Sequence, residues 1–244
     1  MPFRGNPFLV PDDPTTETIA QLRRGVQGWL DYHDRSVQTI LAGPNRGITL
    51  LLRKRGDRQK RLGLYECEVN GFYTRWIKPG MTVYDIGAAD GDTTLPFARR
   101  VGAAGCVYAF EPDDEPFGHL YRLNQNLKLN PDLAPRIEVV CRAVGNAFRL
   151  DDFPFPPSPP DFVKVDVDGQ EFEVLESAHK ILAVSRPVWL IEVHSQDLED
   201  HCRATFDRAD YATKVIRQAW WRPLLGLREG RPIPYNAWLA ARPN

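Results

Sequence analysis

The stretch "VYDIGAADGDTT" at residues 83–94 decides the fold. An apolar run ends here in Asp85 and is followed by an alternation of Gly and Ala, a second acidic residue and a second Gly. Glycines in such a turn let a ligand approach the backbone closely, because they carry no side chain and accept unusual backbone angles. An apolar strand before the turn and a helix after it place the ligand at the carboxyl end of a parallel sheet.

Alternating strands and helices follow residue 80. The expected strands are 81–87, 105–112, 136–145, 161–169, 187–194, 212–218 and 236–241. The expected helices are 92–101, 113–130, 170–182 and one after residue 196. Continuous apolar strands between helices predict a parallel sheet that is covered on both faces. The fold class expected is α/β, doubly wound, with a mostly parallel seven-stranded sheet and an antiparallel edge hairpin formed by the last two strands.

An N-terminal helical extension precedes this pattern. Residues 15–42 carry apolar side chains at helical spacing, namely Ile19, Leu22, Val26, Trp29 and Leu30. The basic run at 53–61 is interpreted as a solvated turn, and the alternative is a patch for an acidic substrate or a phosphate. We therefore expect a helical and basic extension over residues 1–62 and a ligand-binding domain over residues 63–244.

Composition excludes several classes of protein. The chain has 244 residues, 43% of them hydrophobic and 26% charged, which is typical of a globular protein with a sizeable core. The formal net charge is −1, so no overall positive field attracts nucleic acid, and no nucleic-acid partner is expected. The sequence is compatible with a homo-oligomer.

The cysteines and the first residues indicate the cellular setting. The four cysteines are widely spaced and form no C-x-x-C motif, so neither a zinc clip nor a redox dithiol is predicted. The start of the chain has no apolar run with a small-residue cleavage site, and no segment is long enough to cross a bilayer. A reduced, cytoplasmic setting without a membrane span is expected.

Three kinds of nucleotide ligand compete for the glycine turn. A P-loop requires Gly-Lys-Ser/Thr at its end, and the chain has Gly-Asp-Thr. A dinucleotide site requires G-x-G-x-x-G and a pyrophosphate at the helix N-terminus. The spacing here is G-x-x-x-G, and Asp85, Asp90 and Asp92 would repel a pyrophosphate. S-adenosylmethionine fits better, because it has no phosphate and carries a cationic sulfonium and a cationic ammonium group.

Individual residues also suit S-adenosylmethionine. Asp85 favours the cationic amino-acid end of the ligand, while Gly87 and Gly91 let the backbone pass close to the nucleoside. Glu111 closes the next strand, twenty positions beyond Gly91, where a carboxylate can accept both ribose hydroxyls. A preceding strand, a following helix and this acid together are far more specific than a lone G-x-x-x-G.

The sequence resembles the FkbM-type S-adenosylmethionine-dependent methyltransferases over about residues 64–195. The resemblance rests on "VYDIGAADGDTTLPFA", "GCVYAFEPDDEPFGHL", "VVCRAVG", "DFVKVDVDGQEFEVLESAHKIL" and "WLIEVH". It departs at Ala89 and Asp90, where the family usually has Asn and an apolar residue. It also departs at Asp168, where the family usually has Glu.

The resemblance implies a class I methyltransferase fold and an S-adenosylmethionine-binding methyltransferase domain over residues 63–244, with S-adenosylhomocysteine as the product of the cofactor. It places the methionine side at the glycine turn, the ribose at Glu111, the adenine beyond the third strand and the reactive methyl near Asp166. The cofactor-binding residues so implied are Asp85, Gly87, Ala88, Gly91, Glu111, Pro112, Arg142, Ala143 and Asp166.

Candidate catalytic residues follow the fourth and fifth strands. Side chains two apart on a strand share a face, so Asp166 pairs with Asp168 and Glu192 with His194. A hydroxyl acceptor must lose a proton, and His194, with an unperturbed pKa of about 6.5, is the expected base. Asp166 or Glu192 orients it or accepts the proton instead. In the alternative, His194 bonds a loop carbonyl, and Asp168 and Glu171 cap the next helix.

The expected reaction is O-methylation of a hydroxyl on a small-molecule, sugar or other glycan, or natural-product acceptor, as the resemblance implies. The four polar groups at the strand ends are ligand types for a divalent metal such as Mg²⁺, but no metal is expected. A non-catalytic S-adenosylmethionine-binding module is one alternative. A nucleic-acid methyltransferase is another, but "SPPD" at 158–161 precedes the fourth strand instead of following it. Acceptor specificity is expected in the N-terminal segment, the Pro-rich connector at 150–162 and the Trp-rich C-terminal hairpin.

Overall fold

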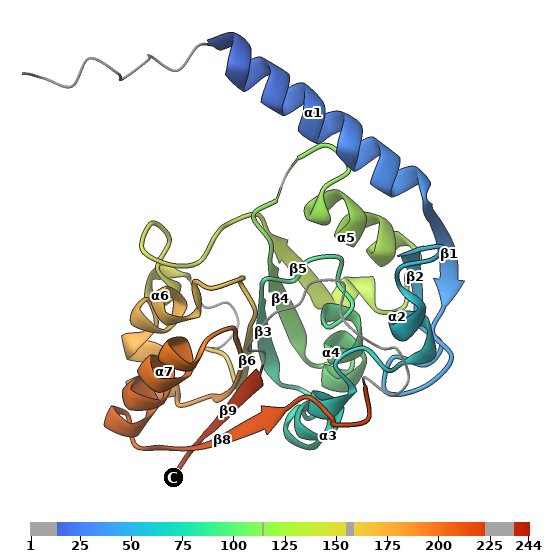
Figure 1. The fold of residues 1–244 in the computed structure, drawn as a ribbon. Coiled ribbons are helices and arrows are strands. Elements are labelled where there is room, and N and C mark those ends of the chain that lie inside the picture. Colours follow the sequence, from blue (N-terminus) through green and yellow to red (C-terminus); the bar gives the residue numbers. More distant parts are fainter. Residues whose placement is uncertain (1–13, 114, 155–158, 223–236) are drawn as a thin grey trace, which may run out of the picture.

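A seven-stranded sheet in the order β5-β4-β3-β6-β7-β9-β8 runs through the molecule (Figure 1). The computed structural model describes residues 14–113, 115–154, 159–222 and 237–244, with side chains from residue 22 onward. The strands are β3 (Thr82–Ile86), β4 (Cys106–Phe110), β5 (Ile137–Val140), β6 (Phe162–Val165), β7 (Val188–Val193), β8 (Tyr211–Arg217) and β9 (Ala237–Pro243).

The first five strands of this order pair in parallel, and β9 lies antiparallel between β7 and β8. The predicted fold class is confirmed, including the antiparallel pair at one edge. Because β3 has β4 on one side and β6 on the other, the connections leaving β3 and β6 diverge at their carboxyl ends. Ligands bind at such a point in open α/β sheets.

Helices cover both faces of the sheet (Figure 1). Successive strand residues point to opposite faces, so Val83 packs in one buried cluster and Tyr84 in the other. The Val83 cluster includes residues of α3 (Cys67–Trp76), α4 (Thr94–Val101) and α5 (His119–Lys128). The Tyr84 cluster includes residues of α6 (Glu171–Glu176) and α7 (Gln196–Arg208).

The N-terminal segment combines a helix with a strand pair. α1 (Pro14–His33) leads into β1 (Arg35–Thr39), which pairs antiparallel with β2 (Thr49–Arg53), and α2 (Arg58–Leu62) follows. The prediction of a helix to residue 42 is therefore wrong beyond His33, because pairing with β2 satisfies the backbone there. The expected apolar stripe of α1 is exposed, with Leu22 at 64% and Val26 at 59%. No described helix has the length and apolarity needed to cross a membrane.

Two helices are shorter than predicted because side-chain carboxylates interrupt them. Asp113 accepts hydrogen bonds from the backbone N–H groups of Glu115 and His119, so the segment before α5 is a turn and not a helix. Asp151 accepts from the N–H groups of Lys180 and Ile181, which starts a new helical turn after α6. Both effects depend on side-chain hydrogen bonds that hydrophobic periodicity does not reveal.

Candidate active site

The glycine turn after β3 is fixed between the ends of β4 and β6. The N–H groups of Gly87 and Ala88 both donate to the carbonyl of Phe110, at 3.0 Å each. Gly87 has φ of +75°, and a Cβ at this position would lie 1.7 Å from the carbonyl oxygen of Asp166. Only glycine fits there. The turn thus connects the carboxyl ends of β3, β4 and β6, and its backbone at Gly87 is not covered by a side chain.

Glu111 lies immediately after β4 and is held by the turn. Its Oε2 accepts a hydrogen bond from the N–H of Ala89 at 2.8 Å, and its Oε1 accepts from the N–H of Asp113 at 2.9 Å. Each carboxylate oxygen keeps further acceptor capacity. The side chain is therefore fixed in place and can still accept hydrogen bonds from a diol.

A cavity of about 670 Å³ opens along the carboxyl ends of the central strands, which is within the usual size of small-molecule sites. Most residues expected at the cofactor line it: Gly87, Ala88, Glu111, Pro112, Arg142, Ala143 and Asp166. Asp85 and Gly91 do not. The expected catalytic residues Glu192 and His194 also line this cavity. Cofactor and catalytic candidates thus share one chamber.

Asp85 lies beneath the turn, fully buried. Its Oδ2 accepts hydrogen bonds from the hydroxyls of Thr93 at 3.0 Å and Thr94 at 2.6 Å, and its Oδ1 lies 3.3 Å from Nζ of Lys164. Burial raises the pKa of Asp85 above its ordinary value, although Lys164 and the hydroxyls oppose the shift. The carboxyl group therefore anchors the first turn of α4 to β3 and does not face the cavity.

Asp90 is neutralised by the chain itself. Its carboxylate lies 2.9 Å from Arg35 of β1, 2.8 Å from Arg122 of α5 and 2.8 Å from Nδ1 of His119. Burial opposes ionisation, but His119 and the surrounding cations hold the pKa of Asp90 well below its usual value. This residue, where the sequence departs from the family pattern, joins the N-terminal segment to the glycine turn.

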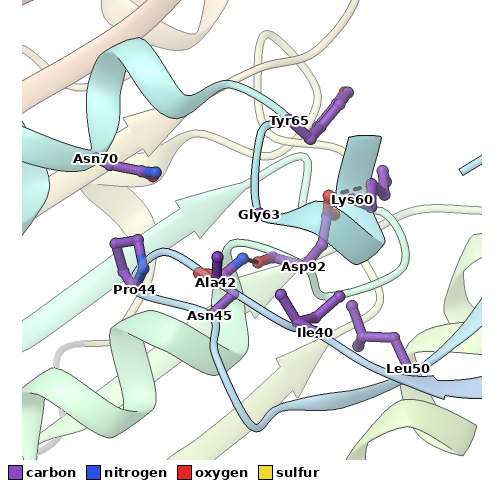
Figure 2. A pocket seen from close by; sticks show the side chains of 10 residues that line it. All are labelled: Ile40, Ala42, Pro44, Asn45, Leu50, Lys60, Gly63, Tyr65, Asn70 and Asp92. Atoms are coloured by element: carbon purple, nitrogen blue, oxygen red, sulfur yellow. Dashed lines mark hydrogen bonds and ion pairs between the residues drawn. The ribbon is translucent and has the colours of Figure 1, made fainter. Parts of the chain in front are cut away.

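Asp92 is paired with Lys60 (Figure 2), and Oδ2 of Asp92 lies 2.8 Å from Nζ of Lys60. The pair borders a cavity of about 20 Å³, which has room for about one water molecule and for no larger ligand. Lys60 is thus an exception within the basic run at 53–61, whereas Arg55 and Arg58 are exposed, as expected for a solvated turn.

Asp85, Asp90 and Asp92 all have cationic partners. Because these partners compensate the three negative charges, the expected repulsion of a pyrophosphate by the turn does not follow.

Asp166, Glu192 and His194 converge at the ends of β6 and β7, which are neighbours. Each offers one polar atom, and these atoms all lie within 4.8 Å of one another. Asp168 is outside this group: it is exposed, and its φ of +53° places it in a left-handed turn. The expected convergence of four polar groups is therefore a convergence of three.

The carboxyl groups beside His194 change its proton affinity. Nδ1 of His194 lies 3.4 Å from Glu171 and Nε2 lies 3.6 Å from Glu192. These two acids raise the pKa of His194 to about 10, although burial acts in the opposite direction. Burial and the adjacent Asp166 raise the pKa of Glu192 to about 8. An unperturbed pKa of about 6.5 is therefore the wrong starting point for His194.

Sequence reasoning gave no role to Lys164, which is 2% exposed in the middle of β6. Its ammonium donates to the carbonyl of Gly87 at 2.8 Å and lies 3.3 Å from both Asp85 and Asp166. Burial lowers the pKa of Lys164, but Asp166 and Asp85 more than compensate and raise it above its ordinary value. A lysine within the apolar run "FVKV" was the signal that could have identified it.

Glu66 is a second residue that the sequence did not indicate. It precedes α3 in a left-handed conformation with φ of +46° and lines the cavity. Burial, followed by the charges of Asp166 and Glu192, raises the pKa of Glu66 well above its ordinary value. Only long-range packing brings this carboxyl group to the strand ends, so no local pattern could have found it.

Known proteins resemble the chain in sequence and in fold. Residues 132–213 match the sequence model of the family described as "Methyltransferase FkbM domain". This match spans β6, β7 and the residues that contribute the Asp166, Glu192 and His194 group. No curated protein is significantly similar to the chain.

Solved structures share the fold at low sequence identity. An S-adenosylmethionine-dependent O-methyltransferase of Thermotoga maritima has a TM-score of 0.53 and 16% identity, covering 71% of this chain. The chain spans 63% of that protein's length. A precorrin-6y C5,15-methyltransferase of Geobacter metallireducens has a TM-score of 0.54 and 15% identity, covering 80% of this chain and 95% of its own. An rRNA methylase of Streptococcus thermophilus has a TM-score of 0.51 and 15% identity, covering 71% of this chain and 92% of its own. These neighbours show the class I methyltransferase fold.

Proposed function

We propose that this chain, an S-adenosylmethionine-dependent methyltransferase with an FkbM domain, transfers the methyl group to a hydroxyl oxygen of a small-molecule, sugar or natural-product acceptor. The observation that carries the proposal is the position of Asp166, Glu192 and His194. These side chains line the same cavity as Glu111 and the glycine turn, so an acceptor beside them would face a cofactor held there.

For the cofactor, we propose that Glu111 accepts the ribose hydroxyls and that Arg142 and Ala143 border the adenine. The open backbone at Gly87 and Ala88 lies beside the methionine part, and Asp166 lies near the sulfonium methyl. Asp85 and Gly91 contribute from outside the cavity. Asp85 ties α4 to β3, and Gly91 keeps the turn closed through its N–H bond to the carbonyl of Ala88 at 2.8 Å.

The reaction forms an oxygen–carbon bond to the methyl group and breaks the sulfur–carbon bond, which leaves S-adenosylhomocysteine. The hydroxyl proton passes to a carboxylate of Asp166 or Glu192. His194 lies between Glu171 and Glu192, and this position suits it to hold the Glu192 carboxyl group in place at the cavity. Alignment of oxygen, carbon and sulfur supplies much of the rate enhancement, on the order of 7 kcal/mol in ideal cases.

We propose that residues 1–62 form an acceptor-binding extension to a methyltransferase domain over residues 63–244. Arg53, Gln59 and Lys60 from this segment line the same cavity as the proposed cofactor residues. β2 is also bonded to α5, because the N–H of Leu51 donates to Oδ1 of Asn126 at 2.8 Å. Parts of the other two segments expected to set specificity, residues 155–158 of the Pro-rich connector and 223–236 between β8 and β9, lie outside the described residues.

The test is to incubate the chain with methyl-labelled S-adenosylmethionine and a panel of hydroxylated acceptors. We expect label transfer by the wild-type chain and its loss in Asp166→Ala and His194→Ala, with S-adenosylhomocysteine binding retained in both variants. Cofactor binding without transfer to any acceptor would favour the non-catalytic module. Calorimetry with Glu111→Gln checks the ribose contact, and we expect an affinity loss of about 10-fold or more, because hydrogen bonds to charged groups contribute about 1.5–3 kcal/mol.

A further inference from the structure

The three polar groups at the ends of β6 and β7 form a compact ligand set. Asp166 follows β6, Glu192 lies within β7 and His194 follows β7, and one atom from each lies within 4.8 Å of the others. Glu192 is 6% exposed, and the side chains of Asp166 and His194 are 26% and 17% exposed. The set is thus mostly buried but opens into the large cavity, where an ion could enter.

A buried carboxyl group stands behind His194. Glu171 is fully buried, and its Oε1 accepts from the N–H groups of Val167 and Gly169 and lies 3.4 Å from Nδ1 of His194. Within the described residues, Oε2 of Glu171 and Nδ1 of His194 have no hydrogen-bond partner of good geometry. A histidine that binds a metal through one nitrogen almost always has a carboxylate or carbonyl beside the other nitrogen.

We propose that Asp166, Glu192 and His194 bind a divalent cation, with Nε2 of His194 as the nitrogen ligand and Glu171 orienting the imidazole ring. Two carboxylates and one imidazole suit a hard or borderline ion such as Mn²⁺ or Mg²⁺. Ligand atoms lie about 2.0–2.2 Å from such an ion and so at most about 4.4 Å from one another. Small side-chain rotations therefore close the set around the ion.

The ammonium group of Lys164 makes the three ligands unequal in strength. Nζ of Lys164 lies 3.3 Å from Oδ2 of Asp166 and competes with the ion for this carboxylate. Glu192 and His194, 3.6 Å apart, are therefore the stronger pair. The inference departs from the expectation that the enzyme needs no metal. It goes beyond the proposed function, because the ion would bind without acceptor or cofactor.

The test is a titration of the chelator-treated full chain with MnCl₂ alone, followed by calorimetry and by the electron paramagnetic resonance signal of free Mn²⁺. We expect one saturable site, with the affinity lowered at least about 10-fold in Glu192→Gln and in His194→Gln. We expect a loss of about 10-fold in Glu171→Gln, as for groups that orient metal ligands. Circular dichroism and melting temperature identify a variant that fails to fold.

His179→Gln is the matched control. His179 lies 3.4 Å from Glu176 in an exposed pair of similar geometry, outside the cavity. We expect its Mn²⁺ titration to equal that of the wild-type chain. Absence of saturable binding, or binding that stays unchanged in both folded Glu192→Gln and His194→Gln variants, overturns the inference. Because acceptor and cofactor are absent from the titration, that outcome leaves the proposed methyl transfer to a hydroxyl standing.

Discussion

Two acidic clusters lie at the same edge of the sheet, one around Asp90 and one around Asp166. The carboxylate of Asp90 contacts three cationic or hydrogen-bonding side chains, each within 2.9 Å. Asp166 has Lys164 at 3.3 Å, but this lysine lies equally close to Asp85, and the second acid Glu192 lies beside Asp166. In the Asp90 cluster, cations of the chain therefore neutralise the carboxylate, whereas in the Asp166 cluster the acids outnumber the cations.

The difference separates a structural role from a chemical one. A buried carboxylate surrounded by cations has little capacity left for a ligand, and its removal destabilises the fold because it leaves those cations buried and unpaired. Buried acids that outnumber their cations shift one another's pKa values, and such groups are concentrated at functional sites. The Asp90 cluster ties the N-terminal segment to the glycine turn, and the Asp166 cluster faces the cavity.

The largest effect is expected from Asp166→Asn, which removes a proton acceptor at the cavity. We expect methyl transfer to fall by about 10²–10⁴-fold, the usual contribution of a positioned acid or base, with a nearly unchanged melting temperature. Turnover assays with labelled cofactor measure the loss. The matched control is Asp168→Asn: this exposed residue lines the same cavity but is outside the three-residue group, so the variant should keep most of the turnover. Equal losses in the two variants would refute the assignment.

The converse result is expected for Asp90→Asn. This change leaves Arg35 and Arg122 facing a neutral amide, and breaking a buried ion pair costs about 3 kcal/mol or more. For a chain of this size the melting temperature should fall by about 6–12 °C. Turnover per folded molecule should remain. Asp210→Asn is the control, because that side chain is 74% exposed and pairs with Arg186 at 3.5 Å, so its melting temperature should hardly change.

The stability difference between the wild-type chain and Asp90→Asn should depend on pH. The pKa of Asp90 is depressed in the folded state, so its contribution is present above the unfolded value of about 3.9 and is lost as pH falls below it. The pKa of His119 is raised by Asp90, so its contribution is present below about 6.5 and is lost as pH rises through the folded value. Urea midpoints should differ most between these limits. A difference that grows below about pH 4 would be inconsistent with this coupling.

The smallest effect is expected from His119→Gln. The imidazole is 46% exposed, and Asp90 keeps both arginines without it. The loss should therefore be under about 1 kcal/mol, or about 2–4 °C in melting temperature. Calorimetric melting measures this shift. A loss as large as that of Asp90→Asn would show that the arginines alone do not neutralise Asp90.

The central fold could be predicted because its signals are local. The apolar strands ending in Asp85 and Asp166 and the helices between them specify a parallel sheet by periodicity alone. The positions of the Asp166–Asp168 and Glu192–His194 pairs could also be predicted, because the carboxyl ends of neighbouring parallel strands lie at the same edge of the sheet. The first departure was at Asp168, which lies in a left-handed turn after β6 and is outside the group that Asp166 forms with Glu192 and His194.

The remaining features depend on contacts across the chain. The strand pair after His33 forms because β2 is available as a partner. The negative charge of Asp90 is compensated in part by Arg35, which lies 55 residues away in the sequence. Glu66 reaches the cavity only through the packing of the segment before α3. The pKa of His194 is set by two acids, one on α6 and one on β7. None of these has a signature within its own stretch of sequence.

The most direct test of the account follows the methyl group itself. The chain is supplied with S-adenosylmethionine labelled with ¹³C in the methyl group and with an acceptor from the hydroxylated panel, and the carbon chemical shift of the product methyl is measured. We expect a methyl carbon bonded to oxygen, formed by the Asp90→Asn variant at close to the wild-type rate and by the Asp166→Asn variant at least about 10²-fold more slowly. A methyl carbon bonded to nitrogen or carbon, or product formation by Asp166→Asn at the wild-type rate, would contradict the proposed reaction.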